Sequence, residues 1–264
     1  MSGAGFAWLV DGLPSYRAAR VWRRNATTYR RVWPGNLLGH LADPLFYLGV
    51  LGYGVGAFMP DVDGVPYVVF LVPGLVAAAG MASACFEGAF SSYFRLHTQG
   101  TFDGILATPV SLADLAAGET VWAATKGAIS ALATLGVAAA FGLVPTWWGL
   151  LIVPIALLQG IFFGALSLAI AAHMESMDHL NHFYALFIMP AMFVSDVFFP
   201  IERLPAAVQT LALASPLTHA VHLARPLSQG AVPADWLLEL LWLALAGAAG
   251  LALATWSLRR RLIV

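Results

Sequence analysis

Four side chains in the second half of the sequence have the types and spacing of a metal site. Relative to the first they lie at offsets 0, 3, 4 and 7, so a helix would place them on one face: Glu175, Asp178, His179 and His182. Carboxylates and imidazoles are adequate ligands for a divalent metal. The cluster nevertheless falls in a short connection between two apolar segments, where polar residues are expected, and we predict no bound metal.

A second group consists of charged side chains inside or at the ends of apolar segments: Asp43, Glu87, Glu119, Lys126 and Asp196. A charge inside a membrane is costly unless it is paired, so such residues are functional candidates. Glu119 and Lys126 share a helix face. We expect Lys126 to pair with Glu119 through an intermediate group or with Glu87. Because these charges cluster near segment ends, we predict that they hold helices together and do not relay protons.

A third candidate is the polar stretch 94–114. Phe102, Ile105 and Leu106 form a short apolar face, and Pro109 breaks the helix that carries them. Ser111 and Asp114 then form an S-x-x-D capping box that starts the next helix. A short amphipathic helix followed by a break and a cap fits a groove on a soluble partner.

The motifs that several other chemistries require are absent from the sequence. The only lysine, Lys126, is followed by Gly127, so there is no P-loop to bind ATP. The glycine pairs Gly52/Gly56 and Gly160/Gly164 fit close helix packing better than a dinucleotide loop. No nucleophile–base pattern is visible, and the single cysteine, Cys85, excludes an intramolecular disulfide. We therefore expect no catalytic residue and no cofactor in this chain.

The composition indicates whether these residues are surrounded by water or by a membrane. Of 264 residues, 60% are hydrophobic and only 10% are charged, and the mean hydropathy is +0.79. Soluble domains carry about 25% charged residues. This composition excludes a disordered chain, a nucleic-acid binder and a typical soluble enzyme. The class it indicates is an integral membrane protein.

The apolar residues form long continuous runs, which favours helices over the alternating strands of a barrel. An all-α protein with six transmembrane helices is therefore predicted, at Leu37–Met59, Tyr67–Tyr93, Leu115–Leu143, Trp148–Ala172, Leu180–Phe199 and Trp236–Leu258.

The arginines orient these spans. Six of the 13 basic residues precede the first span, Arg95 follows the second, and Arg259, Arg260 and Arg261 close the chain. By the positive-inside rule both termini are cytoplasmic, which requires an even number of spans.

Before the first span, Tyr16–Trp33 has the pattern of an interfacial helix. Trp22, Ala26, Tyr29 and Trp33 form an apolar stripe, with arginines on the other face directed toward anionic lipid. A merely basic tail that sets topology is the alternative, and Pro34 ends the helix in either case. The chain thus divides into a cytoplasmic N-terminus, 1–34, and a transmembrane domain, 35–264.

Motifs along the chain resemble a known family. The run Gly100-Thr-Phe-Asp-Gly-Ile-Leu-Ala-Thr-Pro-Val-Ser111 is similar to the loop after the second span of ABC-2 type transport permeases. Asp43-Pro-Leu-Phe-Tyr, Phe70-Leu-Val-Pro-Gly-Leu and Ser215-Pro-Leu-Thr-His resemble further segments of that family, in the same order. Phe86-Glu-Gly and Trp122-Ala-Ala-Thr-Lys look most like its nodulation subfamily, which is associated with lipochitooligosaccharide export.

The resemblance implies a six-span ABC-2 permease fold in the bacterial inner membrane. It implies an assembly of two copies of this chain with two copies of a separate ABC ATP-binding subunit of the nodulation type, which would hold the MgATP. The implied coupling residues are Arg95, Thr101, Phe102, Asp103, Leu106, Thr108, Pro109 and Ser111. It further implies that the segment 200–235 forms short re-entrant helices on the outer side, and that Asp196 makes the outer gate more polar than in many relatives.

The implied cargo is a lipid-linked or amphiphilic saccharide, moved outward. The alternatives are an ABC-2 permease for a drug or another hydrophobic cargo and, from a different class, an ion-coupled secondary transporter that uses Asp43, Glu87 and Lys126. The second alternative lacks a visible internal repeat. No nucleic-acid partner is expected.

Overall fold

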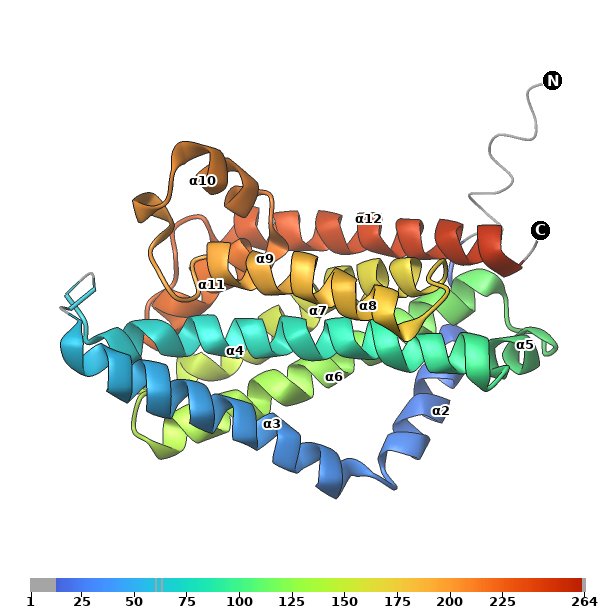
Figure 1. Cartoon of the computed structure of the whole chain (residues 1–264), viewed down its shortest axis with the longest axis horizontal. Coiled ribbons are helices and arrows are strands. Elements are labelled where there is room, and N and C mark those ends of the chain that lie inside the picture. The colour runs from blue at the N-terminus through green and yellow to red at the C-terminus, as the bar shows by residue number, and fades with distance from the viewer. Residues whose placement is uncertain (1–12, 60, 63, 263–264) are drawn as a thin grey trace.

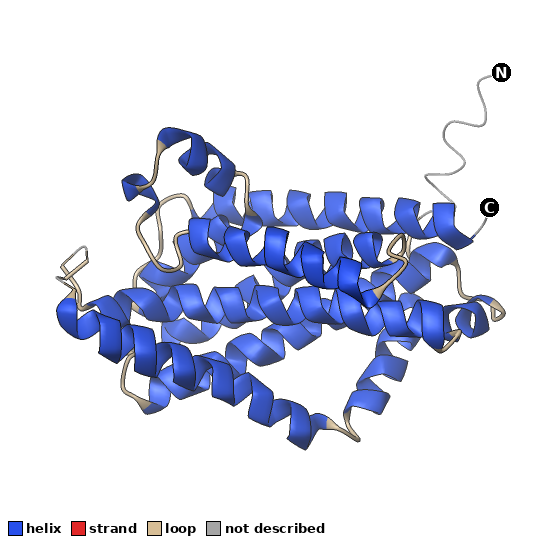
Figure 2. Ribbon diagram, in the orientation of Figure 1, coloured by secondary structure: helices blue, strands red, loops and turns tan. Residues whose placement is uncertain are grey.

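The computed structural model describes residues 13–59, 61–62 and 64–262. Within these ranges the protein is built almost entirely of helices (Figure 2), and the strand-like pairing they contain is one isolated β-bridge between Val62 and Val65. Residues 1–12 of the predicted cytoplasmic N-terminus lie outside the described residues.

Five of the helical segments are long and apolar enough to cross a membrane: Trp33–Phe58, Tyr67–Thr98, Leu112–Ala140, Trp147–Ala171 and Trp236–Leu262. They correspond to five of the six predicted spans, and four of them extend the prediction by three to five residues at one end. Figure 1 shows most of them running side by side along the long axis of the molecule.

The first two spans change helical form along their length. The first consists of α3 (Trp33–Tyr47), a π-helical stretch Leu48–Val55 and a short 3₁₀ turn Gly56–Phe58. The second consists of α4 (Tyr67–Phe86) and two π-helical turns, Glu87–Ser91 and Phe94–Thr98. Each also contains an internal proline, Pro44 or Pro73, which removes one backbone donor.

The remaining spans are α6 (Leu112–Ala140), α7 (Ile152–Ala171, preceded by the 3₁₀ turn Trp147–Leu151) and α12 (Trp236–Leu262). Glycines let α7 approach its neighbours closely, as the sequence predicted. A Cβ on Gly160 would lie 3.0 Å from Ala124 Cα, and one on Gly164 would lie 2.7 Å from Ala123 Cβ. On α6, a Cβ on Gly127 would lie 2.6 Å from the carbonyl oxygen of Gly80 on α4.

The predicted fifth span is a helix that changes form twice: α8 (Met177–Phe183), a π-helical turn Tyr184–Ile188 and α9 (Met189–Val194). It is not among the five apolar helices, since its first two turns are polar and it ends before Asp196, which has a positive φ of 62°. Figure 1 shows it roughly parallel to α4 and α12. The count of six spans stays a prediction.

The segment 200–235, which the sequence predicts on the outer side, contains the 3₁₀ turn Ile201–Arg203, α10 (Ala206–Leu213) and α11 (Pro216–Ser228). α11 is buried along one side and contributes Leu217, Val221 and Leu223 to the main apolar core. α10 stands apart, at the opposite end of the molecule from the short helix α5 (Thr101–Leu106) (Figure 1).

The N-terminal helix α2 (Ala18–Tyr29) packs across the start of α6. Its most buried residues are Val21 and Asn25, whereas Trp22, Ala26 and Tyr29 are only partly covered. Trp33 already belongs to α3, and Pro34 lies in the first turn of that helix. The buried side of α2 is therefore centred on Val21 and Asn25 and not on the expected stripe, because the helix packs against α6.

Candidate functional site

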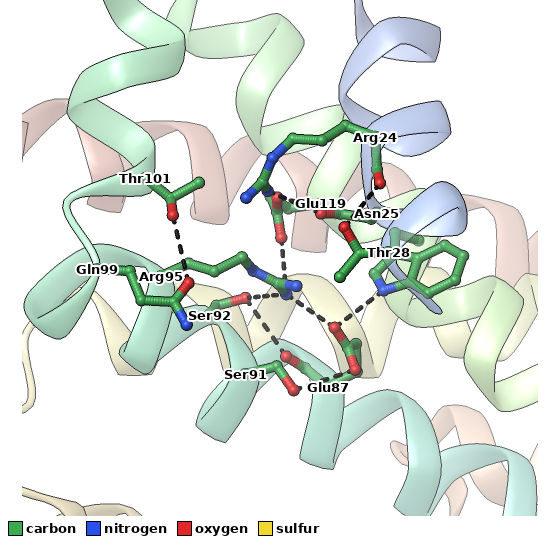
Figure 3. A network of polar contacts seen from close by, with 11 residues as sticks. Arg24, Asn25, Thr28, Glu87, Ser91, Ser92, Arg95, Gln99, Thr101 and Glu119 are labelled. Carbon is green, nitrogen blue, oxygen red and sulfur yellow. Dashed lines mark hydrogen bonds and ion pairs between the residues drawn. The ribbon is translucent and has the colours of Figure 1, made fainter. Parts of the chain in front are cut away.

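The candidate site is a polar network where α2, the end of the second span and α6 meet. Glu87 lies in the π-helical turn after α4, and Arg95 lies in the next one. Glu119 and Trp122 are on adjacent turns of α6, and Asn25 comes from α2. Figure 3 shows these side chains converging from separate elements.

Arg95 is the centre of the network. Its Nη2 atom lies 2.8 Å from Glu87 Oε1 and 2.9 Å from Glu119 Oε2 (Figure 3). Only the contact with Glu87 also has hydrogen-bond geometry, so the contact with Glu119 is an ion pair alone. The Glu119 side chain is fully buried and that of Arg95 is 13% exposed. Two carboxylates thus share one guanidinium in a place with little water.

Neutral donors complete the shell around the two carboxylates. Trp122 Nε1 donates to Glu87 Oε1 at 2.9 Å, and Ser91 Oγ donates to Glu87 Oε2 at 3.1 Å. Asn25 Nδ2 donates to Glu119 Oε1 at 2.9 Å. The network therefore joins α2, α6 and the end of the second span through hydrogen-bonded charges. That Glu87 and Glu119 hold these helices together stays a prediction.

A second arginine adjoins the buried carboxylate. Arg24 donates to the side-chain oxygen of Asn25 at 3.0 Å. Its pKa is lowered by partial burial, an effect that the negative charge of Glu119 opposes and the positive charge of Arg95 reinforces. Arg24 therefore faces the network, in contrast to the expectation that the α2 arginines point to lipid headgroups.

The segment 94–114 is fixed to the body of the protein by its apolar side. Phe102 is 0% exposed and belongs to an apolar cluster with Leu115, Leu168 and Leu258. Leu106 is partly buried against the same cluster. Phe102 and Arg95 thus face the interior of the chain, which corrects the expectation that they face a partner. The physical reason is that Phe102 packs completely against the spans beside it, while Arg95 pairs with the buried carboxylates of Glu87 and Glu119.

Polar contacts fix the C-terminal end of the same segment. The predicted capping box is present: Asp114 N donates to Ser111 Oγ at 3.1 Å, and Ser111 N donates to Asp114 Oδ2 at 3.0 Å. Ser15 N also donates to Asp114 Oδ1, and Arg17 Nη1 donates to the Pro109 carbonyl at 2.6 Å.

On α5 and the turn that follows it, the side that remains exposed is polar and small. It consists of Asp103, Gly104, Ala107, Thr108, Pro109 and Ser111. Thr101 is partly exposed and donates to Gln99 Oε1 at 3.3 Å. Of the eight predicted coupling residues, those with access to a partner are therefore Asp103, Thr108, Pro109 and Ser111, and in part Thr101 and Leu106.

The expected pairing of Lys126 is wrong. Its Nζ lies 4.0 Å from the centroid of the Tyr29 ring, and no carboxylate of the described residues lies within ion-pair distance. The side chain faces a cavity that Asp43 also lines. Glu119, seven residues earlier, is instead taken up by Asn25 and Arg95.

Asp196 belongs to a different cluster, which it forms with side chains of α11 and α12. Its carboxylate accepts from Arg225 Nη1 and from the backbone N–H of Ile201, the latter at 3.1 Å. His222 lies 3.8 Å from the same carboxylate and 3.4 Å from Glu239, which also contacts His219. The predicted polar outer residue is therefore already neutralised within the chain.

The four residues with metal-ligand spacing do not form a site. Within the described ranges, no group of three or more His, Cys, Asp or Glu side chains could hold a metal ion. The segment instead starts α8, where Ser176 caps the helix by accepting from His179 N at 3.4 Å.

Sequence reasoning missed Asn25, Trp122 and the histidines of the outer cluster. Asn25 could have been noticed as a polar residue four positions after Val21, on the face that proved to be buried. Nothing local marks His219 or His222, since their partner Glu239 is on another helix, α12.

Comparison with known proteins places these features in a family. A family model described as "ABC-2 type transporter" matches residues 17–227. The protein named Nodulation protein J from Rhizobium leguminosarum bv. trifolii is 38% identical over 231 residues, 87% of each chain. That from Rhizobium meliloti (strain 1021) is 37% identical over 80% of each chain. A more distant relative is the Inner membrane transport permease YadH from Escherichia coli (strain K12), which is 19% identical over 76% of this chain and 78% of its own.

Proposed function

The chain belongs to the ABC-2 type transporter family, and from that premise we propose that it is the membrane-spanning subunit of an ATP-driven exporter for an amphiphilic saccharide. Membership makes it a multi-pass membrane protein and a transport subunit, not an enzyme, and implies that it works with an ABC ATP-binding subunit. The proposal adds the direction of transport, the class of cargo and the surface at which the two subunits meet.

The cargo is proposed as a lipochitooligosaccharide. The support is the name carried by the relatives at 38% and 37% identity, Nodulation protein J, over most of their length. A drug or another hydrophobic cargo is the alternative, and YadH, at 19% identity, is named only as a transport permease. An ion-coupled carrier is disfavoured because Glu87 is occupied by Arg95 and Trp122.

The coupling surface is proposed as the exposed side of α5 and the turn that follows it. The observation that carries this is the contrast between the two sides of the segment. Phe102 is completely buried, whereas Asp103, Ala107 and Thr108 are exposed. A soluble subunit that pushes on the exposed side would move a segment already fixed to α6 and α12, so the force reaches the spans.

The basic residues support a cytoplasmic position for this surface. α2, α5 and the last turn of α12 lie at one end of the molecule, opposite α10 (Figure 1). That end carries Arg95, the arginines of α2 and Arg259, Arg260 and Arg261. By the positive-inside rule it faces the cytoplasm. We propose the bacterial inner membrane, with two copies of this chain and two ATP-binding subunits that hold MgATP.

The test is co-purification of the ATP-binding subunit with the tagged permease from membranes. We expect the double variant Asp103→Arg/Ala107→Arg to lose the ATP-binding subunit, because two bulky cations then cover the proposed surface. Thr210→Arg, on exposed α10 at the other end, is the matched control and should retain it. Undiminished recovery with the double variant would refute the coupling surface.

A further inference from the structure

A cavity of about 670 Å³ lies between α3, α4, α6 and the segment Tyr184–Val194. Along α4 it extends from Glu87 to Leu75, which is about 18 Å at the helical rise of about 1.5 Å per residue. That length and volume suit a small-molecule group of several rings. The polar network described above forms only its inner end, through Glu87.

Lys126 faces this cavity and has no ion-pair partner among the described residues. The side chain is 7% exposed, and its contact with the Tyr29 ring uses the positive charge but supplies no hydrogen-bond acceptor oxygen. In the part of the chain that the structure describes, no carboxylate lies within 4.0 Å of its ammonium. An ammonium buried at membrane depth is costly in this state. A ligand oxygen would satisfy it.

Two residues of α3 face the same space with unused polar atoms. The Nε2 atom of His40 is buried and has no hydrogen-bond partner among the described residues. The carboxylate of Asp43, also on the cavity wall, forms no hydrogen bond or ion pair with any described side chain. Glu87 differs, because Arg95, Trp122 and Ser91 already occupy its oxygens.

The charges select the kind of ligand. Lys126 and Asp43 carry opposite charges and neither is paired, so an anionic ligand would meet Asp43 and a cationic ligand would meet Lys126. A purely apolar ligand would leave Lys126, His40 and Asp43 without partners. An uncharged group rich in hydroxyls or amides offers acceptors to Lys126 and donors to Asp43 at once.

The rest of the wall agrees with such a group. Hydroxyl side chains are distributed along the cavity, and aromatic rings give flat apolar surfaces between them: Ser83, Ser130, Thr134, Tyr47 and Tyr184. At the edge, Phe86 is 55% exposed and Met189 is 40% exposed. A polar head inside the cavity could therefore continue into an acyl chain that lies on these exposed side chains.

We propose that this cavity within a single chain binds the uncharged saccharide head of the amphiphile, with Lys126, His40 and Asp43 as the polar contacts that select it. This inference rests on the proposed function for its cargo class, and it adds the site and the residues. It is independent of the coupling surface on α5.

The experiment uses the full chain in lipid nanodiscs with a thiol placed in the cavity. Ala82→Cys puts a partly exposed thiol on the α4 wall, and the native Cys85 is 0% exposed, so its background is low. The rate of modification by a water-soluble maleimide is then measured with three tetrasaccharides. They are chitotetraose (uncharged), its fully deacetylated form (cationic) and tetragalacturonate (anionic).

We expect chitotetraose alone to slow the modification of Ala82→Cys. Adding Lys126→Met or Asp43→Asn should raise the concentration needed for half protection at least about tenfold. Ala107→Cys, exposed on α5, is the matched control and should react at the same rate with and without sugar. Thermal unfolding of each variant identifies one that has lost its fold. Asp43→Asn, at an exposed position on the cavity wall, keeps the test valid if Lys126→Met does not fold.

Three results would overturn the proposal: no protection by chitotetraose, equal protection in the folded variants, or protection by a charged tetrasaccharide in its place. Co-purification of the ATP-binding subunit separates the two proposals. A permease that keeps this subunit but is not protected refutes the head-group site alone. A permease that is protected but never recovers the subunit refutes the coupling surface alone.

Discussion

Replacing Arg95 by methionine tests whether the buried network holds the inner end of the protein together. Methionine keeps most of the length of the side chain and removes the charge. The change leaves Glu87 and Glu119 without their shared cation, and these carboxylates are 10% and 0% exposed. Both would then face each other as like charges in a region with little water.

The expected cost follows from the burial. Breaking a buried ion pair by removing one partner destabilises a protein by about 3–5 kcal/mol, chiefly because the other charge stays buried. Here one nitrogen, Arg95 Nη2, contacts both carboxylates at 2.8 and 2.9 Å. We therefore expect Arg95→Met to lose stability by an amount in that range, reduced to the extent that Arg24 compensates Glu119.

The assay is unfolding of the purified permease in nanodiscs, followed by the fluorescence of tryptophan. Arg203→Met is the matched control, since Arg203 is exposed and its side chain contacts no described partner; a change within about 0.5 kcal/mol is expected. Adding Glu119→Gln to Arg95→Met should recover part of the loss, because it removes one of the two stranded charges. If Arg95→Met behaves like the control, or the second change lowers stability further, the network is not what holds these helices together.

Three further changes test other parts of the structure. Gly127→Ala should lower the unfolding free energy by about 1–3 kcal/mol, because its Cβ would lie 2.6 Å from the Gly80 carbonyl oxygen. Gly136→Ala, with open space around it, should not destabilise the protein. Equal effects of the two changes would contradict the close packing of α4 on α6. Phe102→Ala should cost about 3–5 kcal/mol and speed protease cleavage within 94–114, and an unchanged cleavage rate would contradict the fixed position of α5. Arg225→Met should lower the unfolding free energy of the permease, and the double variant Arg225→Met/Asp196→Asn should lose less than Arg225→Met alone. If the double variant instead loses the sum of the two single losses, the pairing of Arg225 with Asp196 is contradicted.

Local features of the fold were predictable because their causes are local. The capping box of Ser111 and Asp114 depends on residues three positions apart, and the structure contains it. Five of the predicted spans depend on runs of apolar residues, and all five are found. The remaining predicted span, Leu180–Phe199, is preceded and interrupted at its start by polar residues. Length and hydropathy alone therefore do not settle whether it crosses the membrane.

The candidate site was less predictable because its contacts join distant parts of the chain. Glu87 and Glu119 are charged residues within apolar segments, so the sequence predicts that they are buried and paired. It places Arg95, the cation that pairs with them, in a loop that docks a partner. The second helical segment continues to Thr98, which carries Arg95 back against α6. For Phe102 the sequence predicts contact with a partner, because an amphipathic pattern shows which face of a helix is apolar. The pattern does not show whether a partner or another part of the chain covers that face.

Lys126 illustrates the limit of pairing by spacing. Glu119 lies on the same face of α6, yet its carboxylate accepts a hydrogen bond from Asn25 of α2 and has no contact with Lys126. The Tyr29 ring, also from α2, covers the ammonium. Both partners depend on how α2 crosses α6, and no pattern within α6 encodes that.

The central claim is that the exposed side of α5 meets the ATP-binding subunit. A photo-crosslinking amino acid placed at Asp103, and separately at Thr210 on α10, tests it in the intact complex. We predict a covalent product with the ATP-binding subunit from position 103 and none from position 210. A product from position 210, or none from position 103 in a complex that stays assembled, would contradict it.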